Sequence, residues 1–377
     1  MAMDRLFLLM KEKHASDMFF AINSPVHLKI NGNLIPINQQ KLDADNIQSL
    51  LSEIVSEDEM ATLLRDSELN VGIPRADIGR FRLSAFRQRG SISAVFRFVP
   101  SEIPALGDLG LPPVLGELIM EKRGLMLLVG ATGSGKSTTI ASMLDYRNET
   151  KSGHILTLED PIEYLFKNKK SIVNQREIGA DSKDFYTALR NSMRQAPDVI
   201  VIGEIRDKET MSAALAYAQS GHLVLATLHA NNSYNALNRI ISFFPIENRP
   251  ALLQDLASTI KAIVSQRLIR SKDGGTRTPA VEVMVNTRFV ADLIEKGEIG
   301  QIKEAMEKSL SPGSQSFEAA LLGLVNEGVI TQEEALANAD SASNLLWLMN
   351  NASAGGDKQE EKKPSDDSAF SEFTLNV

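Results

Sequence analysis

The sequence predicts an α/β protein in which a mostly parallel sheet, covered by helices on both faces, follows a smaller α+β unit. Two observations lead to this prediction. From about residue 114 to 350, apolar runs of strand length alternate with helical patterns, which is typical of parallel strands buried on both faces. Residues 1–99 instead mix shorter stretches with the periodicity of a helix and shorter stretches with that of a strand, and they end in a polar–apolar alternation. With 377 residues, the chain is long enough for two such units.

The first unit is expected to span residues 1–99. Its most specific feature is a hairpin, in which residues 79–86 alternate polar and apolar side chains, turn at Arg89-Gly90 and return over 92–98. Such alternation indicates strands with one buried face. The expected elements, in chain order, are a helix at 7–11, strands at 18–22 and 26–30, a helix over 47–55, and the two hairpin strands.

A proline-rich stretch is expected to link the two units. Residues 100–113 carry four prolines and two glycines, a composition typical of linkers. The second unit is expected over 114–350, and residues 351–377 are expected to be disordered because they are polar and low in complexity. The apolar end of this tail, 370–377, is either a docking motif or a solvated end without a partner.

The second unit is expected to alternate strands with helices. A run of consecutive apolar residues marks each strand, and helical patterns cover most of the stretch from about 248 to 350. The predicted strands are 125–129, 155–158, 199–202, 223–228, and one more near 276–284 that interrupts the helical patterns.

Residues 130–137 read GATGSGKS, which is the G-x-x-x-x-G-K-[ST] pattern of a phosphate-binding loop between a strand and a helix. Glycines let backbone N–H groups point at phosphate oxygens, Lys136 can reach the β- and γ-phosphates, and the Ser137 hydroxyl can bind Mg²⁺. A glycine-rich turn without a ligand is the alternative, and the flanking strand and helix argue against it. The sequence therefore predicts that a nucleoside triphosphate with Mg²⁺ is held by Gly130, Ala131, Thr132, Gly133, Ser134, Gly135, Lys136, Ser137 and Thr138.

Acidic residues follow two of the predicted strands, at the edge where a parallel sheet presents its ligand crevice. Glu204 lies two residues beyond the end of the strand at 199–202 and is expected to support Mg²⁺, directly or through water. Glu159 and Glu163 follow the strand at 155–158, and either of them could orient the attacking water. For each carboxylate, a helix cap or a surface turn is the alternative.

Two histidines, His222 and His229, flank the predicted strand at 223–228. Their odd separation places them on opposite faces of a regular strand, so at most one of them is expected to face the nucleotide. A structural role is the alternative for each. No third ligand accompanies them at metal spacing, so zinc is not expected.

The composition argues against several classes of protein. No apolar run approaches the ~20 residues needed to cross a bilayer, and the N-terminus, with an apolar patch only at 7–10, does not resemble a signal peptide. The chain has no cysteine, which excludes disulfides and cysteine catalysis and suits a cytoplasmic location. A net charge of −8 and a pI near 5.4 argue against a nucleic-acid partner.

Four motifs together resemble those of the secretion and type IV pilus ATPases of the RecA-like class, in the same order. They are GATGSGKSTT (Walker A), ILTLEDPIEY (acidic box), DVIVIGEIRD (Walker B) and GHLVLATLHA (histidine box). The segments GRFRLSAFRQRG and AVFR resemble the arginine-bearing part of the preceding domain in this family. The resemblance covers about residues 1–350 and is greatest to the retraction motors, the PilT/PilU group. The ending NADSASNLLWLMNN is similar to the PilU branch.

The resemblance implies a RecA-like ATPase domain behind a PAS-like domain, with ATP in the cleft between them. It implies that Lys136 and Ser137 hold phosphates and Mg²⁺, that Glu204 supports Mg²⁺, that Glu163 polarises water and that His229 senses the γ-phosphate. By the same resemblance, the candidate contacts that compensate charge on the phosphates are Arg80, Arg82 and Arg97. A solvated face of the hairpin is the alternative for these arginines.

The resemblance also implies a homo-hexameric motor that powers or assists pilus retraction and twitching motility. Its implied partners are an inner-membrane pilus platform protein and a cognate retraction ATPase, and its implied location is the cytoplasmic face of the inner membrane. The sequence departs from the family pattern at Ala131, at Gln195 and over 287–294. The last departure, together with the tail, favours an alternative: a nucleotide-binding accessory subunit that docks on a cognate motor. A DNA-translocating ATPase is a third hypothesis, against which the acidic pI counts.

Overall fold

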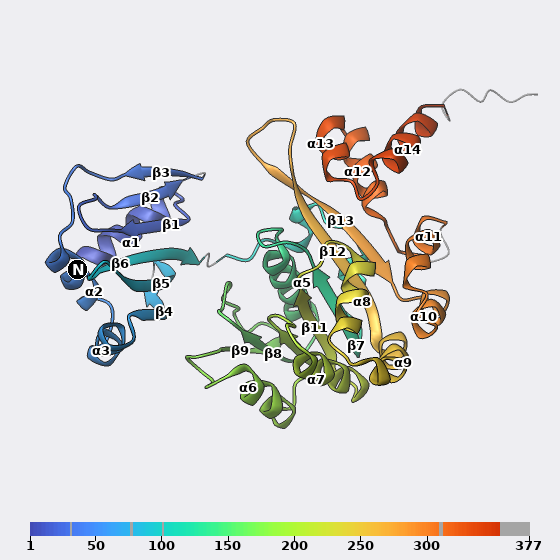
Figure 1. Ribbon diagram of the computed structural model, residues 1–377, viewed down its shortest axis with the longest axis horizontal. Coiled ribbons are helices and arrows are strands. Elements are labelled where there is room, and N and C mark those ends of the chain that lie inside the picture. Colours follow the sequence, from blue (N-terminus) through green and yellow to red (C-terminus); the bar gives the residue numbers. More distant parts are fainter. Residues whose placement is uncertain (31, 76–77, 100–101, 309–311, 355–377) are drawn as a thin grey trace, which may run out of the picture.

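The computed structural model describes residues 1–30, 32–75, 78–99, 102–308 and 312–354. It contains two sheets, an antiparallel one in the N-terminal part and a mostly parallel one in the larger part (Figure 1). The N-terminal sheet has a hydrophobic core of its own, and the larger sheet has one on each face. The predicted fold class, a mostly parallel α/β unit preceded by a smaller α+β unit, is confirmed.

The N-terminal sheet has the strand order β3-β2-β1-β6-β5-β4, and every pair in it is antiparallel. The predicted hairpin is confirmed as β5 and β6. The strand β3 was not predicted, because all of its side chains are exposed and its sequence shows no buried alternation. The elements are α1 (Ala2–Glu12), β1 (Asp17–Phe20), β2 (His27–Ile30), β3 (Asn33–Pro36), α2 (Ala44–Ser52), α3 (Glu57–Asp66), β4 (Glu68–Arg75), β5 (Gly79–Gln88) and β6 (Ser91–Val99).

Aromatic packing joins α1 to the N-terminal sheet. Phe7 stacks on Phe81 with a centroid separation of 4.0 Å, and it meets Phe96 edge-on at 5.6 Å. Met3 and Met10 lie on the same buried face of α1, four and three residues from Phe7. The predicted helix at 7–11 was therefore too short, because its apolar face begins at Met3.

The larger sheet has the order β13-β12-β7-β11-β10-β8-β9, and only the pair β12–β13 is antiparallel. Within 102–113, the described part of the predicted linker forms the short helix η1 (Leu106–Leu109). The elements that follow are α4 (Val114–Leu118), β7 (Gly124–Val129), α5 (Lys136–Thr150), β8 (Gly153–Glu159), β9 (Ser171–Glu177), α6 (Phe185–Ser192), η2 (Met193–Gln195), β10 (Val199–Ile202), α7 (Lys208–Gln219), β11 (Leu223–Leu228), α8 (Ser233–Ser242), η3 (Ile246–Asn248), α9 (Arg249–Thr259), β12 (Ile260–Arg270), β13 (Arg277–Val285), α10 (Arg288–Glu295), η4 (Ile299–Gln301), α11 (Ile302–Glu307), α12 (Phe317–Asn326), α13 (Gln332–Asn338) and α14 (Ala342–Ala354).

Two expectations for the C-terminal half were wrong. Residues 260–270 form a strand, β12, and not a helix. The prediction failed because a strand that is covered on both faces has apolar residues at odd and even positions, and periodicity alone cannot distinguish it from a buried helix. The predicted disorder from residue 351 begins too early, because α14 continues to Ala354. The rest of the predicted tail, 355–377, lies outside the described residues. The predicted strand near 276–284 is confirmed as β13.

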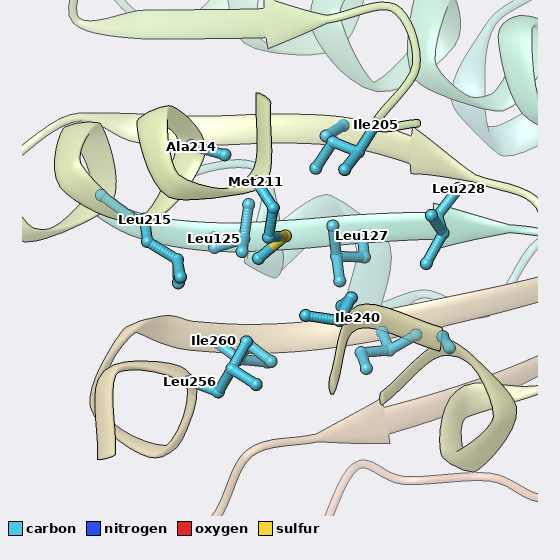
Figure 2. Packing of buried hydrophobic residues seen from close by; sticks show 14 of the residues in the cluster. Leu125, Leu127, Ile205, Met211, Ala214, Leu215, Leu228, Ile240, Leu256 and Ile260 are labelled. Atoms are coloured by element: carbon cyan, nitrogen blue, oxygen red, sulfur yellow. The ribbon is translucent and has the colours of Figure 1, made fainter. Parts of the chain in front are cut away.

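The strand β7, an interior strand of the larger sheet, separates two cores. Leu125 and Leu127 point to one face, where α7, α8 and α9 cover the sheet, and Figure 2 shows Met211 of α7 on this face. Met126 and Leu128 point to the other face, against α4 and α5. Since both faces are covered by helices, the carboxyl-terminal edge of the sheet remains for polar chemistry. Among the residues that the structure describes, no helix has both the length and the apolar character that crossing a bilayer requires.

We expect Leu127→Ala to lower the free energy of unfolding by about 2–5 kcal/mol, because Leu127 is fully buried in β7 and its truncation leaves a cavity. Urea denaturation followed by circular dichroism measures the change. Ile246→Ala is the matched control, because Ile246 is 76% exposed and should change stability by less than about 0.5 kcal/mol. Equal losses in the two variants would contradict the assignment of β7 to the core.

Candidate nucleotide-binding site

The glycine-rich loop leaves the carboxyl end of β7 and enters α5 at Lys136. Gly130, Gly133 and Gly135 have φ values of +152°, +78° and +89°, which residues with a side chain rarely adopt. Gly130 also lacks space, because a Cβ there would lie 2.6 Å from the carbonyl oxygen of Gln266. The loop therefore requires glycine for its backbone conformation and for the close approach of β12.

Lys136 lies at the positive end of α5. The side chain is buried, and its Nζ donates hydrogen bonds to the carbonyl oxygens of Gly130 and Ala131, both at 2.8 Å. Burial lowers the pKa of Lys136, whereas the nearby Glu204 and Glu163 raise it. The helix start has no side-chain cap, so its first N–H groups are available to an anion.

A cleft of about 1060 Å³ opens beside this loop. Its volume suits a nucleotide, because ligand pockets commonly measure roughly 300–1,000 Å³. The predicted site residues that line it are Thr132, Gly133, Gly135, Lys136, Ser137, Thr138, Glu163, Glu204, His229 and Arg97. Gly130 and Ala131 line a second hollow on the other side of the loop, the Ser134 side chain is buried, and Arg80 and Arg82 do not line the cleft.

Glu204 and His229 meet because their strands are neighbours. Glu204 follows β10 and His229 follows β11, and these two strands run parallel. His229 Nε2 lies 3.2 Å from Glu204 Oε1, and Arg206 Nε donates to Glu204 Oε2 at 2.6 Å. Glu204 is thus a carboxylate held between two cation-forming groups at the carboxyl edge of the sheet.

The two glutamates of the acidic box, Glu159 and Glu163, lie in different environments. Glu159 accepts hydrogen bonds from Thr157 Oγ1 at 2.6 Å and from Gln175 Nε2 at 3.1 Å, and burial raises the pKa of its carboxyl group. Both glutamates line the cleft, but Glu163 is exposed whereas Glu159 is only partly exposed. Glu163 is therefore the carboxylate with more solvent access, and Glu159 is the one that neighbouring side chains already contact.

The three candidate arginines lie on one face of the N-terminal sheet and have different partners. Arg82 and Arg97 are directly opposite each other in the β5–β6 pair, an unfavourable placement for like charges. Arg97 Nε donates to Asp17 Oδ1 at 2.8 Å while the side chain lines the cleft. Arg82 is partly buried, and its pKa is lowered mainly by that burial and by Arg97. The negative charges near it include Glu163.

Arg80 does not reach the cleft. Its Nη2 donates to Glu177 Oε2 at 2.8 Å, and both side chains are largely buried. Glu177, at the end of β9, also accepts from the backbone N–H of Ile162 at 3.2 Å. The Arg80–Glu177 ion pair therefore joins the N-terminal hairpin to the acidic box.

At most one of the two histidines was expected to face the nucleotide. The structure places only one of them at the cleft, but strand alternation is not the reason. The strand β11 covers only Leu223–Leu228, so both histidines lie beyond its ends and strand alternation does not separate them. His229 lines the cleft at the carboxyl end, whereas His222 lies at the amino end and its Nδ1 is within 3.0 Å of Ser220 Oγ. Only His229 faces the cleft.

Sequence reasoning missed two side chains that support the loop. The Tyr164 hydroxyl is 2.8 Å from Thr138 Oγ1, and Thr139 Oγ1 donates to Gln266 Oε1 at 2.7 Å. Gln266 is buried in β12, the strand that was predicted as helix, so no strand pattern directed attention to it. Tyr164 ends the acidic-box motif, and its phenol was the available signal.

The residues of the cleft fit a bound Mg²⁺. Ser137 and Glu204 offer a hydroxyl and a carboxylate in the same cleft, and Mg²⁺ prefers one or two protein oxygens completed by waters and phosphates. Across the described ranges, no group of three or more histidine, cysteine, aspartate or glutamate side chains could hold a metal ion. The donor set is thus that of a metal shared with phosphates.

The chain is similar to proteins of type IV pili along most of its length. It is 45% identical over 349 residues to "Type IV pilus ATPase PilU" of Pseudomonas aeruginosa, covering 93% of this chain and 91% of that protein. It is 36% identical over 345 residues to "Type IV pilus retractation ATPase PilT" of the same organism, covering 92% of this chain and 100% of that protein. The higher identity to PilU agrees with the resemblance of the ending.

A solved structure supports the same relationship. The crystal structure of the pilus retraction motor PilT with bound ADP superposes with a TM-score of 0.85 at 39% identity, covering 91% of this chain and 99% of that chain. The Legionella pneumophila ATPase DotB superposes with a TM-score of 0.75 at 28% identity, covering 89% of this chain and 94% of that chain. Residues 3–316 match the family described as "Type II/IV secretion system protein". The chain belongs to this family, and the predicted resemblance to the PilT/PilU group is confirmed.

Proposed function

We propose that the chain is a Mg²⁺-dependent ATPase that works as a hexameric motor of the type IV pilus machinery and powers or assists pilus retraction. The observation that carries the proposal is one cleft that gathers Lys136, Glu163, Glu204 and His229 around a phosphate-binding loop. The relatives described above, a pilus ATPase and a pilus retraction motor, support the biological role.

Each cleft residue has a role that its surroundings support. Lys136 and the loop N–H groups hold the β- and γ-phosphates, and Thr138 adds a hydroxyl that Tyr164 positions. Ser137 and Glu204 would hold Mg²⁺, which neutralises charge on the phosphates when bound. His229, 3.2 Å from Glu204, senses the γ-phosphate.

Glu163 is the better candidate for orienting the attacking water. Its carboxylate is exposed in the cleft, whereas the Glu159 carboxylate is already engaged by Thr157 and Gln175. The water oxygen forms the new bond to the γ-phosphorus while the bond to the β–γ bridging oxygen breaks, and Glu163 accepts the proton of the water.

Arg82 and Arg97 compensate charge on the phosphates. Their direct opposition in the hairpin is unfavourable until an anion lies between the sheet and the loop, and Arg97 already lines the cleft. Arg80 can take part only after it leaves Glu177, because the ion pair holds it outside the cleft. Closure of the N-terminal unit over the nucleotide would change this pairing.

The partners and location are inferred from the relatives. A homo-hexamer would act on an inner-membrane pilus platform protein, at the cytoplasmic face of the inner membrane, alone or beside a cognate retraction ATPase.

Steady-state Mg-ATP hydrolysis across a series of protein concentrations, paired with sedimentation, tests the ATPase activity and the assembly of the chain. We expect turnover per chain to rise as hexamers form. If the chain binds ATP but hydrolyses it only after a cognate retraction ATPase is added, the accessory role is favoured. The segment 287–294, which departs from the family pattern, supports that alternative.

Gly130→Ala should weaken ATP binding by roughly tenfold or more, because the loop must distort to admit a Cβ at φ +152° and 2.6 Å from the Gln266 carbonyl oxygen. Titration with a fluorescent ATP analogue measures the dissociation constant. Gly107→Ala is the control, since a Cβ at Gly107 meets nothing within 4 Å. Unchanged affinity in Gly130→Ala would contradict the proposed phosphate cradle.

Arg97→Gln should lower kcat/KM for ATP by roughly 10²–10³-fold, because it removes a charge that acts on the phosphates in the transition state. The matched control is Arg65→Gln, which removes an exposed arginine of α3 that pairs with its neighbour Asp66. Initial rates at varied ATP concentration separate the two variants. A loss below twofold for Arg97→Gln would leave the arginine as a solvated side chain of the hairpin.

Glu159→Gln and Glu163→Gln should differ. We expect Glu163→Gln to lower kcat by roughly 10²-fold, since a general base typically contributes this much. Glu159→Gln should keep most of the turnover, because an amide can still accept the hydrogen bond from Thr157. Single-turnover hydrolysis of radiolabelled ATP compares them, and the reverse order of effects would reassign the base to Glu159.

A further inference from the structure

The helices α12–α14, called the C-terminal helices below, pack beside the β12–β13 hairpin (Figure 1). A polar link from these helices to the nucleotide site runs through Arg267 of β12. The Arg267 guanidinium donates to the carboxylate of Asp340 and to the carbonyl oxygen of Asn338, and its Cζ lies 3.9 Å from the centroid of the Phe317 ring. One arginine thus contacts three points of the C-terminal helices and their connections.

The same arginine reaches the segment that carries His229. Arg267 Nη2 also donates to the carbonyl oxygen of Asn231 at 3.1 Å, and Asn232 Nδ2 donates to Asp340 Oδ2 at 2.7 Å. Residues 229–232 are called the histidine loop below. They begin at the cleft with His229 and end at Asn232, which contacts the Arg267–Asp340 ion pair through Asp340. The Arg267 and Asp340 side chains are only 22% and 10% exposed, so the link lies in a place where charges interact strongly.

The helix α8, which follows the histidine loop, has an anchor of its own, although its N-cap residue Asn232 also bonds to Asp340. Ser233, the first residue of α8, is anchored separately, because its N–H donates to Glu282 Oε1 at 2.7 Å and Ser265 Oγ donates to the same atom at 2.9 Å. If the Asp340 link is cut, α8 keeps this anchor. The part whose position then changes is the histidine loop.

We propose that Asp340 is a positioning residue through which the C-terminal helices control the histidine loop, and through it the hydrolysis of ATP. This inference rests on the proposed function, in that it assigns the regulation of the same site. A shift of the C-terminal helices, for example when a partner binds them, moves Asp340 and Arg267 together and carries the backbone at Asn231 with them. The ion pair is the physical connection between the two places.

Asp340→Asn should lower kcat for ATP by roughly fivefold or more while KM changes by less than about twofold, because the histidine loop acts on the γ-phosphate and not on the main binding contacts. Glu307→Gln is the control, because Glu307 of α11 accepts from Asn344 of α14 at 3.0 Å and lies 3.9 Å from Lys303, and within the described ranges no hydrogen bond or ion pair joins it to the histidine loop. A kcat of Asp340→Asn equal to that of the control would overturn the inference.

A double-mutant cycle separates positioning from general loss of structure. If Asp340 acts through His229, Asp340→Asn should lower kcat by less than about twofold in a His229→Ala background. Additive losses would overturn the proposal. Where Asp340→Asn does not fold, Asn232→Ser replaces it, since serine caps a helix about as well as asparagine but lacks the side-chain amide that donates to Asp340.

Hydrogen exchange gives a readout that does not depend on turnover. In nucleotide-free Asp340→Asn, we expect amides of residues 229–232 to exchange at least roughly tenfold faster, while those of α8 beyond Ser233 stay protected. Unchanged exchange in the histidine loop would overturn the inference even if the chain hydrolyses ATP. The two proposals can also fail separately. If the wild-type chain does not hydrolyse ATP but Asp340→Asn still speeds exchange in the histidine loop, the proposed ATPase is overturned and the link between Asp340 and the loop stands.

Discussion

The site depends on one constraint, the parallel alignment of β7, β10 and β11. Adjacent parallel strands end at the same edge, so the loop after β7, Glu204 after β10 and His229 after β11 meet without any long connection. The covered faces of the sheet supply apolar packing on both sides, which fixes the strand ends. The polar side chains at the edge are then held where their strands leave them, and little further structure is needed to orient them.

The phosphate loop is held more tightly than its own sequence indicates. Gly130 touches β12 through the Gln266 carbonyl oxygen, and the Gln266 side chain accepts from Thr139 of α5. The next residue of β12, Arg267, points to the opposite face and contacts the C-terminal helices. The strand β12 therefore touches the nucleotide loop with one residue and the regulatory link with the next. This adjacency gives the C-terminal helices a short path to the site.

Local patterns singled out the candidate residues of the site, whereas long-range contacts escaped prediction. The loop glycines and Lys136 stood out because their motif directly follows an apolar strand, and Glu204 stood out because it lies two residues beyond another apolar strand. The strand β12 was mistaken for helix, since residues 260–270 are apolar at both parities and period cannot separate the two structures. The Arg80–Glu177 and Arg267–Asp340 ion pairs join residues 97 and 73 positions apart, and no pattern within one window contains both partners.

We propose above that this cleft positions ATP and Mg²⁺ for hydrolysis. The most direct test is a crystal structure of the chain with Mg²⁺ and a non-hydrolysable ATP analogue. We expect the γ-phosphate beside Lys136 and His229, the metal between Ser137 and Glu204, and Arg97 turned towards the phosphates. A nucleotide bound elsewhere, or phosphates in the loop with Glu204 and His229 facing away from them, would contradict it.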